Sequence, residues 1–184
     1  IRGGAANRYL VKYGRKIGPD PASIDSAMIG GIAANNASGM CCGTSENSYK
    51  TIADIKLILA DGTELDTASE ESRKNFAATH GKMLEQLEDI ARRIEADQTL
   101  KERIQRKYKI KNTTGYSLNA FVDYKDGFDI LKHIIIGSEG TLAFISSITY
   151  NTVVEHPHKG LALMIFPTIK EACEAVQVLK QQPV

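Results

Sequence analysis

The sequence from residue 18 to residue 43 reads GPDPASIDSAMIGGIAANNASGMCCG, and its composition is unusual. Five glycines, five alanines and two prolines leave few bulky side chains, so another group can approach the main chain closely. We predict a loop rather than a regular helix or strand. Pro19 and Pro21 keep its entry extended, and Gly30-Gly31 allow a tight reversal.

A site lined by backbone is the interpretation that this loop favours. Exposed N–H groups bind phosphates well, which makes a cofactor with a diphosphate the leading candidate ligand. Asn35, Asn36 and Ser38 are its polar groups. A helix packed tightly on a sheet would show a similar run of small residues, and this alternative stays open.

The overall composition is that of an ordinary globular protein. The chain has 184 residues, 42% hydrophobic and 24% charged, which suffices for one core or for one domain and part of a second. A net charge of +1 argues against nucleic acid as the main partner. No apolar run approaches the ~20 residues that span a bilayer. The first residue is Ile1 and not Met, so we expect a piece of a longer chain.

Cysteine and histidine are too sparse for a disulfide framework or a complete metal site. Cys41 and Cys42 are adjacent, and we expect two small buried thiols, with a vicinal disulfide or a metal pair as the alternatives. His156 and His158 flank a proline that keeps them on an extended link. We therefore predict no metal site, and no iron–sulfur cluster within this chain.

Local patterns predict the first elements of secondary structure. Residues 5–13 favour a short helix with Leu10 and Tyr13 facing inward, after a turn at Gly3-Gly4. Residues 51–60 alternate as a strand, with Ile55, Leu57 and Leu59 on one face. Asp61-Gly62 predicts a two-residue hairpin turn, after which the chain returns through residues 63–67.

A long helical region follows from about residue 69 to residue 108. Apolar residues recur there at helical spacing, with a break near Asp97: Met83, Leu84, Leu87, Ile90, Ala91, Ile94, Leu100 and Ile104. Its end carries a basic cluster of Lys101, Arg103, Arg106, Lys107, Lys109 and Lys111. We expect a solvated helix face, with docking of an acidic substrate or partner as the alternative.

The last third of the chain reads as β structure followed by a helix. Residues 132–150 predict two strands, one at 134–136 and one through Leu142, Phe144, Ile148 and Tyr150, separated by Gly-Ser-Glu-Gly-Thr at 137–141. Residues 161–166 favour another strand. Thr168 and Glu171 form a capping box that opens a helix with Ile169, Ala172, Cys173, Val176 and Leu179 on its apolar side. Such a βα unit cannot bury much by itself, so we expect it to begin a second domain.

Polar residues at 111–116, with the sequence Lys-Asn-Thr-Thr-Gly-Tyr, form a third patch that contains glycine. Tyr116 there either stacks on a ring, donates a hydrogen bond or is simply half-buried. The sequence contains no HExxH motif, no Walker lysine loop and no GxSxG elbow.

Three blocks in order, PDPAS…IGGIAANNASG at 19–39, KNTTGY at 111–116 and GSEGTLAFI at 137–145, resemble the FAD-binding domain of the vanillyl-alcohol oxidase / p-cresol methylhydroxylase type. Within it the chain is similar to glycolate oxidase and to the D-lactate and D-2-hydroxyglutarate dehydrogenases. Met28 stands where a threonine is usual, Ser38 replaces a glycine, and Ala143-Phe144 replaces Gly-Ile or Gly-Val.

The resemblance implies an α+β fold. Residues 1–155 would be the second subdomain of the FAD domain, an antiparallel sheet flanked by helices, with a helical insertion at about 69–108. Residues 156–184 would begin a truncated substrate domain. The first subdomain, with its glycine-rich pyrophosphate loop, would precede Ile1. The cofactor-binding residues implied are Ala22, Ser23, Ser26, Met28, Ile29, Gly30, Gly31, Asn35, Asn36, Ala37, Ser38, Gly39, Glu139, Gly140, Thr141, Leu142 and Ile145.

The function implied is that of a flavin-binding part of an FAD-dependent D-2-hydroxy-acid dehydrogenase. The hydroxy acid would pass a hydride to the flavin. The electrons would then go to an unidentified acceptor through an iron–sulfur region that lies elsewhere in such proteins. We expect a cytoplasmic protein, with the inner face of the membrane as the alternative. Two other functions remain open, namely another oxidoreductase on the same flavin fold (an aromatic alcohol oxidase or a nucleotide-sugar reductase) and a non-enzymatic interaction module.

Overall fold

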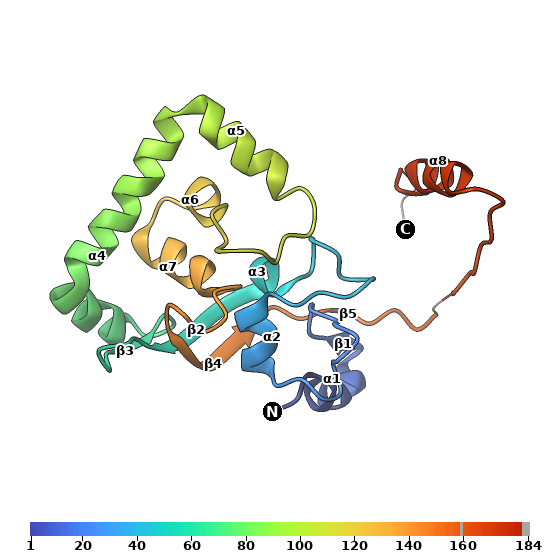
Figure 1. The fold of residues 1–184 in the computed structure, drawn as a ribbon. Helices are drawn as coiled ribbons and strands as arrows, with labels where there is room; N and C mark the ends of the chain where they lie inside the picture. Colours follow the sequence, from blue (N-terminus) through green and yellow to red (C-terminus); the bar gives the residue numbers. More distant parts are fainter. Residues whose placement is uncertain (159, 182–184) are drawn as a thin grey trace.

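A computed structural model describes residues 1–158 and 160–181 of the chain. Its main body joins a small antiparallel sheet to helices, which is the α+β class that the sequence indicates (Figure 1). The sheet has the strand order β3-β2-β4, from Glu64–Asp66, Ile52–Ile58 and Phe144–Tyr150. A two-stranded sheet pairs β1, Arg15–Lys16, with β5, Val153–Val154.

The hairpin of β2 and β3 confirms the predicted strand and its return. Leu57 faces Leu65 across the hairpin, and Ile55 and Leu57 are both 1% exposed. The turn itself differs from the prediction, because Leu59 and Thr63 close a loop of three residues instead of two. Gly62 has φ +84° there, so the glycine takes the left-handed position of the longer loop.

Two helices form the predicted helical region. They are α4, Glu70–Ala96, and α5, Gln98–Lys107, and the Asp97 side chain between them accepts a hydrogen bond from the Leu100 N–H. In Figure 1 they run around the short helices α6, Ala120–Asp123, and α7, Gly127–Ile135. The apolar pattern mostly faces inward, as with Leu84, which is 8% exposed, whereas Leu100 is 40% exposed.

The predicted strand at 134–136 is wrong, because this segment ends helix α7. Asp126 caps the helix by accepting hydrogen bonds from the N–H groups of Phe128 and Asp129 at 3.0 and 3.1 Å. Ile130 and Ile134 lie one turn apart and are both buried. A short apolar run does not distinguish a buried strand from a buried helix, and here the aspartate cap is the better signal.

The N-terminal segment is more helical and less buried than predicted. Gly3 and Gly4 lie in the first turn of α1, Gly3–Leu10, and not in a separate turn. The residues after it form the 3₁₀ helix η1, Val11–Tyr13, and Tyr13 is 59% exposed, so its predicted inward orientation is wrong. The other short helices are α2, Ile29–Asn35, and α3, Ser48–Thr51.

The C-terminal segment lies apart from the main body (Figure 1). Its helix α8, Ile169–Leu179, begins at the predicted cap, where Thr168 Oγ1 accepts from the Glu171 N–H at 3.3 Å. The strand predicted at 161–166 is absent from the described structure, since the segment has no neighbouring strand to pair with, and Leu161 is 92% exposed. No helix in the described residues is long and apolar enough to cross a membrane.

Buried side chains from the sheet and the helices form a single core. Ile55 and Leu57 of β2 belong to the same buried cluster as Phe76 of α4 and Ile130 of α7. Helix α2 packs on β4, at the edge of this core. The core therefore positions the two segments that hold most of the predicted site residues, 28–39 and 137–145.

Candidate functional site

The small-residue segment contains a helix, which corrects the expected loop. Helix α2 begins after Met28, so Gly30 and Gly31 lie in its first turn and make no reversal. The chain reverses at Asn36 instead, which has φ +50°. Asparagine tolerates this left-handed conformation, and Asn36 Oδ1 accepts a hydrogen bond from the Tyr49 N–H at 3.1 Å. The alternative interpretation, a helix of small residues packed on a sheet, therefore applies.

Residues 137–141 form a tight loop between α7 and β4, and not between two strands as predicted. Gly137, Glu139 and Gly140 have positive φ angles of 87°, 54° and 75°. The Gly137 N–H donates to the Ala33 carbonyl at 3.1 Å, and the Glu139 N–H donates to the Ala34 carbonyl at 2.9 Å. These bonds join the loop to the last turn of α2, where the Ala33 carbonyl also accepts from the Asn36 N–H at 2.9 Å.

A side-chain contact strengthens the same junction. Asn35 Nδ2 donates to Glu139 Oε1 at 2.5 Å, although 104 residues separate them in sequence. Asn35 and Glu139, both predicted to bind the cofactor, thus hold the two segments together, whereas Asn36 bonds to Tyr49.

The third patch, residues 111–116, contacts both segments. The Tyr116 hydroxyl lies 2.9 Å from Thr141 Oγ1, which itself donates to the Ser138 carbonyl at 2.6 Å. The Lys111 ammonium donates to the Ser38 carbonyl at 2.9 Å. Of the roles considered for Tyr116, the structure shows the hydrogen bond, and the residue is 42% exposed. Tertiary structure thus brings the three blocks together.

A pocket of about 440 Å³ lies between α2 and the start of β4. Six of the predicted residues line it: Met28, Ile29, Gly30, Gly31, Gly140 and Ile145. The lining also includes Ile1, Ala34, Ala143, Phe144 and Ser146, which are absent from the predicted set. Ala34 lies one helical turn after Gly30 and Gly31, so a helical reading of this segment would have identified it.

The glycines of this pocket leave its wall open. A Cβ atom added to Gly31 or Gly140 would meet no atom within 4 Å, and one added to Gly30 would come 3.6 Å from the Ile145 carbonyl oxygen. The N–H groups of Gly30 and Gly31 lie in the first turn of α2, where a helix provides no acceptor for them. A ligand can therefore approach both the glycine main chain and the apolar side chains of Met28, Phe144 and Ile145.

A second pocket, of about 530 Å³, is lined by Asp20, Ala22, Ser38, Gly39, Met40, Cys41 and Lys111. Asp20 Oδ1 accepts hydrogen bonds from the N–H groups of Gly39 and Cys42 at 2.9 and 3.2 Å. Burial raises the pKa of Asp20, but the hydrogen bond with the Cys42 side chain, the two N–H donors and the charge of Lys16 together hold the pKa below its ordinary value. Asp20 and Lys111 belong to this pocket although sequence reasoning did not select them as ligand contacts.

The remaining predicted residues line neither pocket. Ser23 and Ser26 lie in the exposed turn before α2, where the Ser26 N–H donates to the Ser23 carbonyl at 2.9 Å. The Ala37 N–H donates to the Ile32 carbonyl, which closes the end of α2. Leu142 packs against the core, and Thr141 bonds to Tyr116.

The prediction of two buried thiols is confirmed for Cys42 and wrong for Cys41. Cys42 is fully buried, and burial raises the pKa of its thiol, whereas Cys41 is exposed at the second pocket. Among the residues that the structure describes, no three His, Cys, Asp or Glu side chains lie together as a metal site would require.

The first pocket offers main-chain groups and apolar surface, which are the contacts that a flavin ring would need. Its lining holds three glycines and two alanines and no charged side chain, so a planar ring edge or a phosphate group would meet backbone and apolar groups. A cationic side chain for the diphosphate would have to come from outside this lining.

Comparison with known families gives a match for the first third of the chain. Residues 1–68 match the family model of the FAD binding domain. The match contains the block at 19–39 and ends before those at 111–116 and 137–145. No curated protein matches the chain. The match supports an FAD-binding domain of the vanillyl-alcohol oxidase / p-cresol methylhydroxylase type, and therefore FAD as the cofactor and an oxidoreductase-type role.

Proposed function

We propose that this chain is the flavin-binding part of an FAD-dependent D-2-hydroxy-acid dehydrogenase of the D-lactate or D-2-hydroxyglutarate class. The observation that carries the proposal is the 440 Å³ pocket, whose wall is built jointly by the first and third blocks of the resemblance. The hydrogen bonds from Gly137 and Glu139 to the end of α2 hold that wall in place.

The residues of the pocket would bind and orient the cofactor. Gly30 and Gly31 offer N–H groups and leave room against the main chain. Met28, Phe144 and Ile145 present apolar surface that excludes water from a bound ring. Bound FAD supplies the chemistry, which is acceptance of a hydride from the substrate's α carbon.

No titratable side chain lines this pocket, so we assign no catalytic acid or base to it. The base that takes the hydroxyl proton and the groups that bind the substrate carboxylate would come from a substrate domain. We propose that residues 1–155 form the FAD part, with 69–108 as an insertion, and that 156–184 begin the substrate domain. Residues 159 and 182–184 of that unit lie outside the described part of the chain.

The apolar surface of the C-terminal segment supports this division. Leu163 and Ile165 are 89% and 88% exposed, and helix α8 buries none of its residues. Such surface needs a covering layer, as the first βα unit of a larger domain would have.

The test is the flavin content and substrate range of the protein expressed from its complete reading frame. We expect flavin absorbance on purification or after FAD titration, and bleaching of that absorbance by D-lactate or D-2-hydroxyglutarate but not by the L enantiomers. Absence of flavin binding would contradict the cofactor assignment. Bleaching only by aromatic alcohols, or flavin reduction only by a nicotinamide cofactor, would replace the proposed substrate class by another oxidoreductase class.

A further inference from the structure

Helix α5 and the residues directly after it carry a cluster of cations, most of which have no acidic partner among the described residues. Lys101 bonds to Glu95, and Lys111 donates to the Ser38 carbonyl, so both are occupied. The other four cations, Arg103, Arg106, Lys107 and Lys109, are exposed and form no ion pair with any residue that the structure describes. We refer to these four residues as the α5 cationic face.

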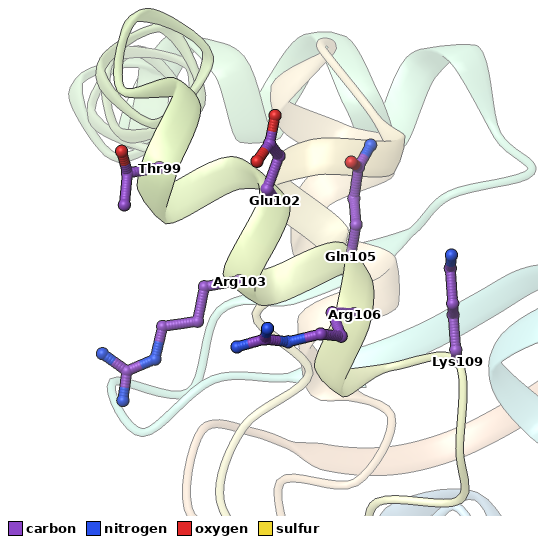
Figure 2. A pocket seen from close by; sticks show the side chains of 6 residues that line it. All are labelled: Thr99, Glu102, Arg103, Gln105, Arg106 and Lys109. Carbon is purple, nitrogen blue, oxygen red and sulfur yellow. The ribbon is translucent and has the colours of Figure 1, made fainter.

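The α5 cationic face borders a broad, open pocket of about 770 Å³. Its lining is polar: Thr99, Glu102, Arg103, Gln105, Arg106 and Lys109. Figure 2 shows the side chains of Arg103 and Arg106 extending from α5 to the same side. Such unpaired guanidinium groups bind carboxylates well because each offers several donors in a fixed plane.

An apolar groove of about 370 Å³ lies beside the same helix. Its lining includes Leu100, Arg103, Ile104, Lys107, Tyr116 and Leu118. Arg103 lines both this groove and the open pocket, so the apolar and cationic surfaces are continuous.

Hydrogen bonds already hold the groove in shape. The Tyr108 hydroxyl donates to the Tyr116 carbonyl at 2.6 Å and accepts from the Leu118 N–H at 3.1 Å. Leu100 and Leu118 remain 40% and 45% exposed. A ligand therefore finds a preformed site whose apolar residues are still open to solvent, which lowers the entropy lost on binding.

We infer that α5 and residues 114–118 form a docking site for an acidic segment of a partner protein. An apolar side chain of the partner would enter the groove, and neighbouring carboxylates would contact the α5 cationic face. Glu102 lies among these cations, which disfavours a uniformly anionic lipid surface. A polypeptide can place its charges around Glu102 and its apolar group in the recessed groove, where Ile104 is only 5% exposed.

The test measures binding of labelled synthetic peptides to the chain by fluorescence anisotropy. One peptide combines glutamate with leucine, and its matched control replaces every leucine by alanine. We expect the leucine peptide to bind more tightly. The double variant Arg103→Gln/Lys107→Gln should bind the leucine peptide about tenfold more weakly, because loss of each exposed cation lowers the affinity about threefold. The control variant Lys74→Gln/Lys82→Gln, which removes two exposed cations from α4, should leave binding unchanged.

A third variant tests the groove itself. Leu100→Gln should weaken the leucine peptide and leave the alanine peptide unaffected, with circular dichroism confirming that the helix content is retained. Equal binding of both peptides, or equal losses in the α5 and α4 double variants, would overturn the inference. Binding to phosphatidylcholine vesicles that contain phosphatidylglycerol, without peptide binding, would also overturn it and assign the surface to a membrane.

Discussion

Replacing Gly31 by leucine tests whether the pocket beside α2 holds the flavin. Gly31 lies in the first turn of the helix and lines the 440 Å³ pocket. A Cβ atom there meets nothing within 4 Å, so the main chain accepts a side chain at this position without a clash at Cβ. Leucine is also a better helix former than glycine, so Gly31→Leu should raise the free energy of unfolding by about 0.5–1 kcal/mol.

The same side chain should exclude the cofactor, because it would occupy space that the ligand needs. Forcing a bulky group into an occupied site costs about 1–3 kcal/mol, which corresponds to roughly 5- to 150-fold weaker FAD binding. FAD titration followed by flavin fluorescence measures the loss, and urea unfolding measures stability. Gly81→Leu is the matched control, because Gly81 lies in α4, has the same open space and lines neither of the two candidate pockets.

Two results would refute the reasoning. Unchanged FAD affinity in Gly31→Leu would show that the cofactor does not use this wall. An equal loss of affinity in Gly81→Leu would show that the effect comes from a general change in the helices and not from the pocket.

Three further predictions concern stability. Gly39→Ala should lower the free energy of unfolding by about 1–3 kcal/mol in urea, because its Cβ would lie 2.0 Å from the Asp20 carbonyl oxygen; a wild-type midpoint would contradict this contact. Ser138→Ala should leave the free energy of unfolding unchanged or raise it by about 1 kcal/mol, since the Ser138 hydroxyl is buried without a hydrogen-bond partner among the described residues. A clear loss of stability would indicate a hidden bond. Burial lowers the pKa of His133 from 6.5 to about 4. The contribution of the neutral ring to stability is therefore complete above pH 6.5, and the free energy of unfolding should fall by about 3 kcal/mol as the pH falls towards 4. His133→Leu should remove most of that pH dependence in urea titrations at several pH values, and an unaltered dependence would assign it to other groups.

The sequence predicted secondary structure correctly where a residue pattern is compatible with only one element. The alternation of Ile55 and Leu57 predicts a strand, and Asp97 and Thr168 begin helices where their side chains cap them. The prediction failed where the same composition fits two structures. The apolar run at 134–136 ends a helix, because a short buried run permits either a strand or a helix. The glycines at 30–31 begin a helix, because a run of small residues suits a helix packed on a sheet as well as a loop.

The candidate site shows the same division. The sequence by itself identified residues 18–43 from their small side chains. The family resemblance then set this stretch in order with the blocks at 111–116 and 137–145. Only the tertiary structure decided which residues face the pocket and which hold it together. Gly31 lines the wall, whereas Asn35 and Glu139 bond to each other across 104 residues. A sequence pattern determines which local conformations a residue favours. The packing of α2 on β4 determines which distant residues it contacts.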